Sequence, residues 1–192
     1  MDAVAQVQLV VRLTLGLIFA VSAVAKLRAP AAFVRGVVAY AIIPPPLARL
    51  YGWTLPFVEL ATALLLLSGF ALIFGSGLAT VMLTSFAAAI AVFSIQGRQL
   101  NCNCFGAGSH AGGGWPALVR DLFLLAAAGW LLTVLVVGRG PVARWPQADP
   151  ELATATVIVA VVLALTFVLL DQGLDVLLTW AGSPGGTSER RY

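Results

Sequence analysis

The chain contains very little charge. Asp, Glu, Lys and Arg together make up only 10% of its 192 residues, whereas hydrophobic residues make up 60%. A soluble domain carries charge on roughly a quarter of its residues, so this composition predicts one compact integral membrane protein. The net charge of +3 is small and dispersed, which argues against nucleic-acid binding. A single histidine argues against haem ligation and against a histidine-rich metal site.

The apolar residues gather in long runs. About 20 of them in a helix are needed to span the ~30 Å hydrocarbon layer of a membrane. Five stretches reach that length, and we place them at residues 7–27, 54–74, 77–96, 116–137 and 152–179. Residues 75–77, Gly-Ser-Gly, are predicted to join the second and third of these in a tight helical hairpin.

The segment between the first two spans, residues 28–53, is not polar enough for an exposed loop and is too short for another span. Pro30 suits the first turn of a helix, where its missing N–H leaves no bond unmade. The three prolines at 44–46 are predicted to stop that helix. We therefore expect a short amphipathic helix over residues 30–42, lying on the membrane surface or packed back onto the bundle.

The predicted fold is an all-α integral membrane bundle of about five transmembrane helices. It is expected to form a single membrane domain over residues 1–192, with a four-helix core at 7–137 and the short surface helix. An additional C-terminal transmembrane helix at 151–180 and a flexible tail at 181–192 complete the prediction.

Five charged residues are predicted to fall at one end of the bundle: Lys26, Glu59, Arg98, Arg120 and Asp121. A charge within the hydrocarbon costs about 2.5–3.5 kcal/mol, so it normally faces a partner or a wet cavity. Pairs such as Lys26 with Glu59 and Arg120 with Asp121 would meet that need. The alternative is that these residues only fix helix ends and reach out to the headgroups. Arg12, near the opposite end, is predicted to be an interfacial anchor.

The two cysteines, Cys102 and Cys104, are separated by one residue and lie where an apolar run gives way to a glycine-rich loop. A disulfide between them would close a small ring, tighter than unstrained disulfides prefer. A strained disulfide is more easily reduced, which is typical of labile and catalytic bridges. Neighbouring cations such as Arg98 and Lys26 would favour the reactive thiolate. The pair therefore favours redox exchange.

Three other interpretations of the two cysteines stay open. A structural disulfide is one, although so short a loop would contribute little stability. A soft metal such as Cu(I), held by both thiolates with His110 nearby, is another. A structural zinc site would need one ligand more than this loop supplies. The third is a pair of inert thiols.

Several short motifs resemble the MauE family of methylamine utilisation proteins, part of a wider MauE/DoxX group of redox-associated membrane proteins. They follow one another in the family's order over about residues 7–137. The matching residues are Arg12, Leu15, Gly16, Phe19, Ser22, Lys26, Leu27, Arg28, Pro30, Phe33, Tyr40, Pro44, Leu55, Pro56, Glu59, Gly97, Arg98, Cys102, Cys104, Phe105, Gly106 and Arg120. This chain departs from the family pattern at Asn103, where glycine is usual, and at Asp121, where asparagine is frequent.

The resemblance implies a role in forming or handling disulfides of an exported protein, together with a thioredoxin-like partner, during maturation of methylamine dehydrogenase. On this reading Cys102 and Cys104 are the catalytic pair, and the electrons pass on to a separate protein or to a quinone. One alternative is a non-catalytic membrane anchor or assembly subunit of a larger complex. Another is a small-solute transporter with Glu59 and Arg120 in its pathway.

The positive charges and the redox chemistry predict opposite orientations of the protein in the membrane. Most of the eleven Lys and Arg fall on the side that carries the cysteines, which the positive-inside rule places in the cytoplasm. Disulfide exchange, however, is favoured on the oxidising side of the membrane. We therefore expect a multi-pass protein of the cell membrane whose cysteine loop lies on the extracytoplasmic face.

Overall fold

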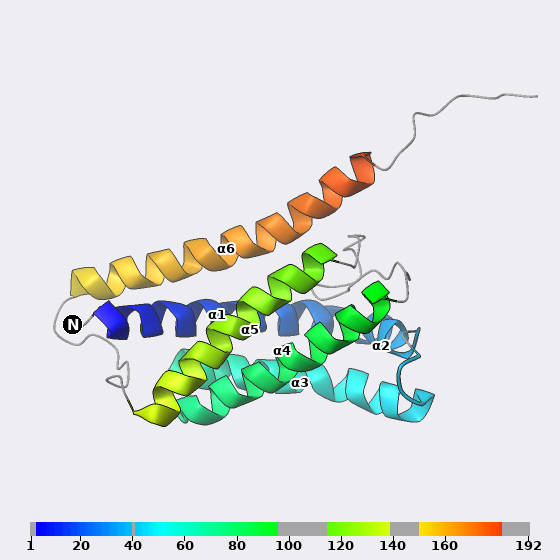
Figure 1. The fold of residues 1–192 in the computed structure, drawn as a ribbon, viewed down its shortest axis with the longest axis horizontal. Helices are drawn as coiled ribbons and strands as arrows, with labels where there is room; N and C mark the ends of the chain where they lie inside the picture. Colours follow the sequence, from blue (N-terminus) through cyan, green and yellow to red (C-terminus); the bar gives the residue numbers. More distant parts are fainter. Residues whose placement is uncertain (1–2, 40, 96–114, 139–149, 182–192) are drawn as a thin grey trace, which may run out of the picture.

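The computed structural model describes residues 3–39, 41–95, 115–138 and 150–181. Within these ranges the regular secondary structure is all helical, without strands, as predicted. The helices are α1 (Ala3–Arg28), α2 (Pro30–Ala39), α3 (Pro45–Ser68), α4 (Leu72–Ile95), α5 (Trp115–Val137) and α6 (Pro150–Ala181), shown in Figure 1.

Four of the helices are long and apolar enough to cross a membrane, which confirms the predicted membrane bundle. They correspond to α1, α3, α4 and α5. The sixth helix, α6, has 32 residues, but the apolar part of it whose side chains are described, Thr154–Leu169, is shorter than a span. A fifth crossing by α6 therefore stays a prediction.

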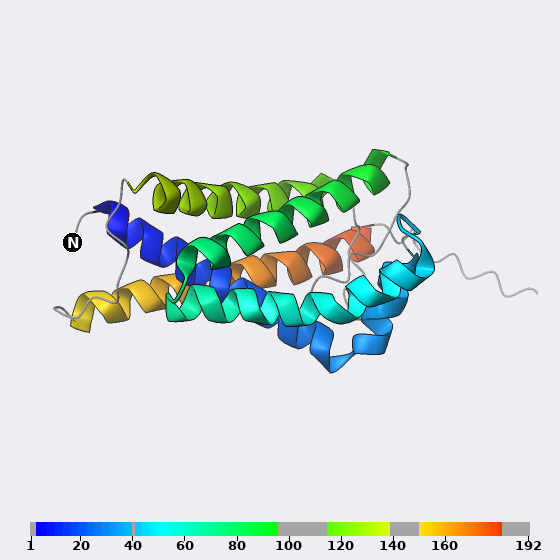
Figure 2. The ribbon, with the colours of Figure 1, turned by 90° about the horizontal axis from the view of Figure 1, so that it is seen from below.

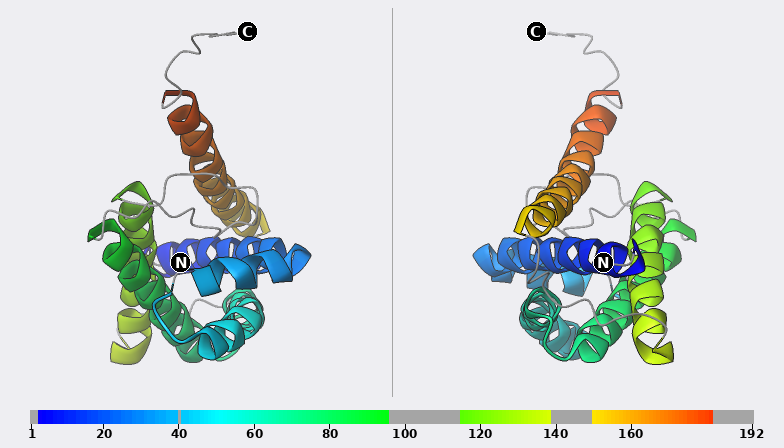
Figure 3. Two further views of the ribbon diagram at one scale, coloured as in Figure 1. Left: turned by 90° about the vertical axis from the view of Figure 1, so that its right-hand side faces the viewer. Right: turned by 90° about the vertical axis from the view of Figure 1, so that its left-hand side faces the viewer.

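The long helices run up and down between two ends of the molecule. The C-terminus of α1, all of α2, the start of α3, the end of α4 and the start of α5 lie together at one end, here called the α2 end (Figures 1 and 2). The N-terminus of α1 lies at the opposite end, where α3 turns back into α4 and α6 begins. Helix α6 packs against α1 on the side away from α3 (Figure 3).

The core is apolar and draws on four helices. Its buried residues come from α1, α3, α4 and α5: Leu15, Phe19, Leu55, Ala63, Leu66, Ala79, Met82, Leu83, Ala128 and Leu131. A smaller cluster joins α1 to α6 through Leu9, Leu13 and Ala160. On α6, the buried Thr156, Ala160 and Ala164 recur every four residues, and such small side chains let two membrane helices approach closely.

The hairpin between the second and third spans turns earlier than predicted. It lies between Ser68 and Leu72, and Gly75 and Ser76 are inside α4 instead of in a turn. Gly69 ends α3 in the left-handed region, at φ 77°, and its N–H donates to the Leu65 carbonyl at 3.1 Å. Glycine adopts that conformation without steric cost. Ser76 is buried inside α4, where its hydroxyl is satisfied by donating to the Leu72 carbonyl at 2.7 Å.

The second span also begins earlier than predicted, at Pro45 instead of residue 54. Pro44 is the N-cap of α3, so the proline run starts a helix, as proline does well in the first turn. The short helix α2 is present where expected, although it ends at Ala39.

Helix α2 is packed back onto the bundle, one of its two predicted positions. Its buried Val34 lies against Gly52 of α3. A Cβ atom added at Gly52 would lie only 3.3 Å from the Val34 Cα, so the absence of a side chain there permits the close approach of the two helices.

Arg12 is not the interfacial anchor that the sequence suggested. Its side chain is only 2% exposed, and its guanidinium donates to the Leu67 carbonyl at the end of α3, at 3.3 Å. The last carbonyls of a helix lack partners within the helix and carry partial negative charge. Arg12 therefore caps the C-terminus of α3 from inside the bundle.

Candidate functional site

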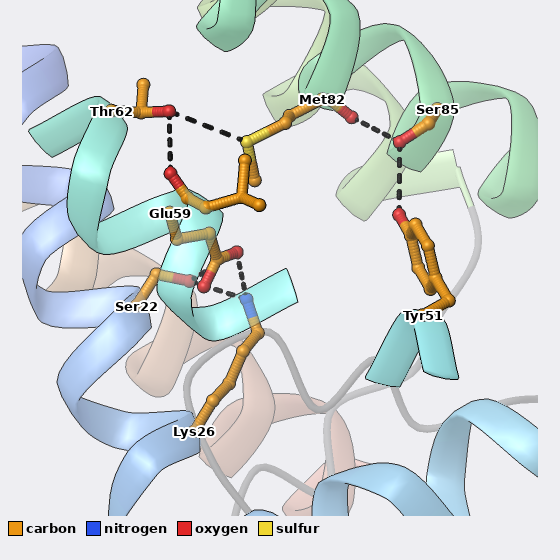
Figure 4. Close-up of polar contacts among 8 residues, drawn as sticks. Ser22, Lys26, Tyr51, Glu59, Thr62, Met82 and Ser85 are labelled. Atoms are coloured by element: carbon orange, nitrogen blue, oxygen red, sulfur yellow. Dashed lines mark hydrogen bonds and ion pairs between the residues drawn. The ribbon is translucent and has the colours of Figure 1, made fainter. Parts of the chain in front are cut away.

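A buried ion pair between Lys26 and Glu59 lies toward the α2 end of the bundle. Lys26 is near the end of α1 and Glu59 is on the antiparallel α3, so the packing of these two helices brings the charges together, as predicted. Lys26 is 2% exposed and Glu59 is 0% exposed. Figure 4 shows the ammonium directed at the carboxylate.

Ser22 completes a three-membered polar group with the ion pair. It lies one turn before Lys26, on the same face of α1. The Lys26 ammonium donates to the Ser22 hydroxyl at 2.8 Å, and that hydroxyl donates to Glu59 Oε1 at 3.3 Å (Figure 4). The Ser22 hydroxyl is thus hydrogen-bonded to both charged groups. These bonds offset part of the cost of removing the two charges from water.

Two aromatic rings enclose the ammonium. Lys26 Nζ lies 5.3 Å from the ring centre of Phe33 on α2 and 5.4 Å from that of Phe86 on α4. The negative faces of aromatic rings attract cations at this distance. Lys26 on α1 and Glu59 on α3 thus meet side chains of α2 and α4, so four helices converge on one ammonium group.

The ion pair lies deeper along α3 than the sequence indicated. With the predicted start of the second span at residue 54, Glu59 would lie just over one turn inside it. Because α3 begins at Pro45, Glu59 instead follows about four turns of helix. The pair is thus separated from the start of α3 by a substantial length of packed helix.

Arg120 and Asp121 lie in the second turn of α5, at the same end of the bundle. Asp121 is 4% exposed. The Arg120 guanidinium carbon lies 5.7 Å from the ring centre of Phe167 on α6, so this arginine links α5 to α6. A direct pairing of Arg120 with Asp121 stays a prediction.

The predicted catalytic residues Cys102 and Cys104 lie outside the described residues, as do Arg98 and His110. The described helices on either side of them do have a defined position. Helix α4 ends at Ile95 and α5 begins at Trp115, both at the α2 end (Figures 1 and 2). In the part of the chain that the structure describes, no three His, Cys, Asp or Glu side chains gather as metal ligands.

The structure also has polar contacts between α3 and α4 that the sequence did not predict. The Tyr51 hydroxyl lies 3.3 Å from the Ser85 hydroxyl, and the Thr62 hydroxyl lies 3.8 Å from the Met82 sulfur (Figure 4). Ser22 could have been found from its four-residue spacing to Lys26. The rings of Phe33 and Phe86 gave no comparable signal, because phenylalanine is common throughout such apolar runs.

Comparison with known proteins identifies the family. The family profile described as "Methylamine utilisation protein MauE" matches residues 4–134. The chain is 32% identical over 144 residues to the "Methylamine utilization protein MauE" of Paracoccus denitrificans, a match that covers 74% of each protein. No solved structure matches the chain. The chain belongs to the MauE family of membrane proteins.

Proposed function

We propose that this protein exchanges disulfides through Cys102 and Cys104 and so supports the maturation of an exported redox protein. The observation that carries the proposal is the Asn-Cys-Asn-Cys-Phe-Gly segment, because it holds both cysteines of the chain with one residue between them. A bridge of that size is strained and therefore a good oxidant. The family name points to methylamine utilisation, so a methylamine dehydrogenase-type substrate is the first candidate.

The proposed exchange takes place in two steps. A thiolate of the exported substrate attacks the oxidised bridge, which breaks the bond between Cys102 and Cys104 and forms a mixed disulfide. A second substrate thiolate then breaks that mixed disulfide and leaves with the new substrate disulfide. The two cysteines retain two electrons and two protons, which pass to the disulfide of a thioredoxin-like partner or to a quinone.

The ion pair supports this proposal through its position. Lys26, Glu59 and the two phenylalanine rings tie α1, α2, α3 and α4 together near the end where the chain leaves α4 and enters α5. We infer that this packing holds the end of α4, and so the start of the cysteine segment, in a fixed position. The roles of Arg98, Arg120 and Asp121 in the same charged group are part of the proposal.

Replacing both cysteines tests the proposed function against its alternatives. The Cys102→Ser/Cys104→Ser protein is expected to insert normally but to leave the exported substrate without its disulfides, as judged by alkylation of the substrate's thiols. A chain with Asn103→Gly, the residue usual in the family, is the matched control and should keep full activity. Full substrate oxidation by the double serine variant would favour an assembly subunit. Cysteine-independent solute flux in liposomes would favour a transporter.

The proposed orientation in the cell membrane places the N-terminus inside and the cysteine segment outside. A cytosolic glutathione pool at about −220 to −320 mV would keep a strained bridge reduced unless a dedicated oxidant maintained it, so the outer face suits the bridge better. An alkaline phosphatase reporter fused after Tyr192 is therefore expected to be active. A fluorescent protein at the same position should be dark when exported through the general secretory route. Bright cells would mean that the orientation follows the positive charges or that α6 does not cross the membrane.

A further inference from the structure

Among the side chains that the structure describes, those exposed from the end of α1 to the start of α3 carry positive and no negative charge. Between Asp2 and Glu59 the sequence has no acidic residue, and Glu59 is itself buried in the ion pair with Lys26. In the same stretch three arginines are exposed: Arg28 at the end of α1, Arg35 on α2 and Arg49 at the start of α3. The exposed charges that the structure describes on this stretch are therefore all positive.

Large apolar side chains are exposed beside these arginines. They lie in the connection from α2 to α3 and on the first turns of α3: Ile42 50%, Ile43 39%, Leu47 54%, Leu50 61%, Tyr51 37% and Trp53 51% exposed. Tryptophan and tyrosine are enriched where a membrane protein crosses from hydrocarbon to headgroups. Tyr51 and Trp53 thus indicate the level of that boundary on α3, with Arg49 about one turn nearer the end of the molecule.

We propose that this surface, defined by Arg28, Arg35, Arg49 and Trp53, binds the phosphate headgroups of anionic phospholipids. A guanidinium matches a phosphate through two parallel hydrogen bonds. Basic residues beside a membrane span are attracted to anionic lipids. The apolar side chains among the arginines favour lipid over an acidic soluble protein, because they can enter the acyl region while the arginines remain with the phosphates. The inference does not depend on the proposed redox function.

The test measures lipid preference at Trp53 in the full chain. The other tryptophans, Trp115, Trp130, Trp145 and Trp180, are replaced by phenylalanine, and the protein is reconstituted with brominated phosphatidylglycerol or brominated phosphatidylcholine. Bromine quenches a nearby indole, so wild-type arginines should give stronger quenching by the anionic lipid. Arg28→Gln/Arg35→Gln/Arg49→Gln is expected to lose that preference, by up to about fivefold in relative binding for each arginine. About 1 M salt should weaken it as well.

The matched control removes two arginines from the segment between α5 and α6. Arg139→Gln/Arg144→Gln lies between α5 and α6, which end and begin away from the α2 end, and should keep the preference. If the single-tryptophan chain does not fold, native mass spectrometry of the unmodified chain and its triple variant measures retained phosphatidylglycerol instead. Equal quenching by both lipids, or a preference that survives the triple substitution, would overturn the proposal. So would stronger binding to soluble polyglutamate than to the anionic lipid, which would indicate an acidic protein partner.

Discussion

Glu59→Gln is expected to lower the free energy of unfolding by about 3–5 kcal/mol, the usual cost of removing one partner from a buried ion pair. The Lys26 ammonium would stay 2% exposed with no carboxylate beside it, and neither the Ser22 hydroxyl nor the aromatic rings can supply a negative charge. Thermal unfolding in detergent, followed by tryptophan fluorescence, should show a midpoint lower by roughly 10 °C.

A double substitution separates the loss of a partner from the loss of packing. Lys26→Met/Glu59→Leu removes both charges and keeps much of the volume, and replacing a buried pair by hydrophobic residues is often neutral. We expect it to recover most of the midpoint that Glu59→Gln loses. Arg28→Gln, which removes an exposed cation two residues beyond Lys26, is the matched control and should change stability by about 0.5 kcal/mol or less. An unchanged midpoint in Glu59→Gln would mean that the buried ion pair does not stabilise the bundle.

Gly69→Ala is expected to cost about 1–3 kcal/mol, because a residue with a side chain is strained at φ 77°. The new Cβ would also lie 2.9 Å from both terminal nitrogens of Arg12 and would displace the guanidinium that caps α3. The same fluorescence measurement of thermal unfolding in detergent reports the loss.

The matched control is Gly77→Ala in α4, where an added Cβ meets no atom within 4 Å. Alanine is the better helix former, so this change should be neutral or slightly stabilising. Arg12→Met/Gly69→Ala removes the clash and should cost less than the sum of its two single changes. A harmful Gly77→Ala with a harmless Gly69→Ala would mean that the hairpin turns at residues 75–77 after all.

Hydropathy was enough to predict the membrane bundle, but not where its helices begin and end. A continuous apolar run gives no break between α3 and α4, because one glycine in the left-handed region decides the turn. At Pro45 the same proline signal can stop one helix or start the next, and the sequence does not say which. The surface helix was predictable because Pro30 marks its start and its apolar residues recur at helical spacing.

The charged group was partly predictable for a physical reason. Charges are so costly in hydrocarbon that Lys26 and Glu59 had to find partners, and the antiparallel order of the helices put them at the same end. The contacts of Lys26 with Phe33 and Phe86 depend on how α2 packs back onto the bundle and on which face α4 turns toward α1. No local sequence pattern encodes either. Arg12 was misplaced because a cation near a helix end usually reaches water, whereas this one finds the carbonyl of Leu67.

We expect Cys102 and Cys104 to exchange disulfides with a partner. With one cysteine replaced by serine, the remaining thiol can form a mixed disulfide but no second cysteine of this chain can resolve it. Membranes from cells expressing Cys102→Ser or Cys104→Ser, quenched with acid and alkylated, are separated on non-reducing gels with the double serine variant as control. A covalent adduct with an exported or thioredoxin-like protein, present in at least one single variant and released by reductant, is the result that we predict. The absence of such an adduct from both single variants would show that the two cysteines do not exchange disulfides.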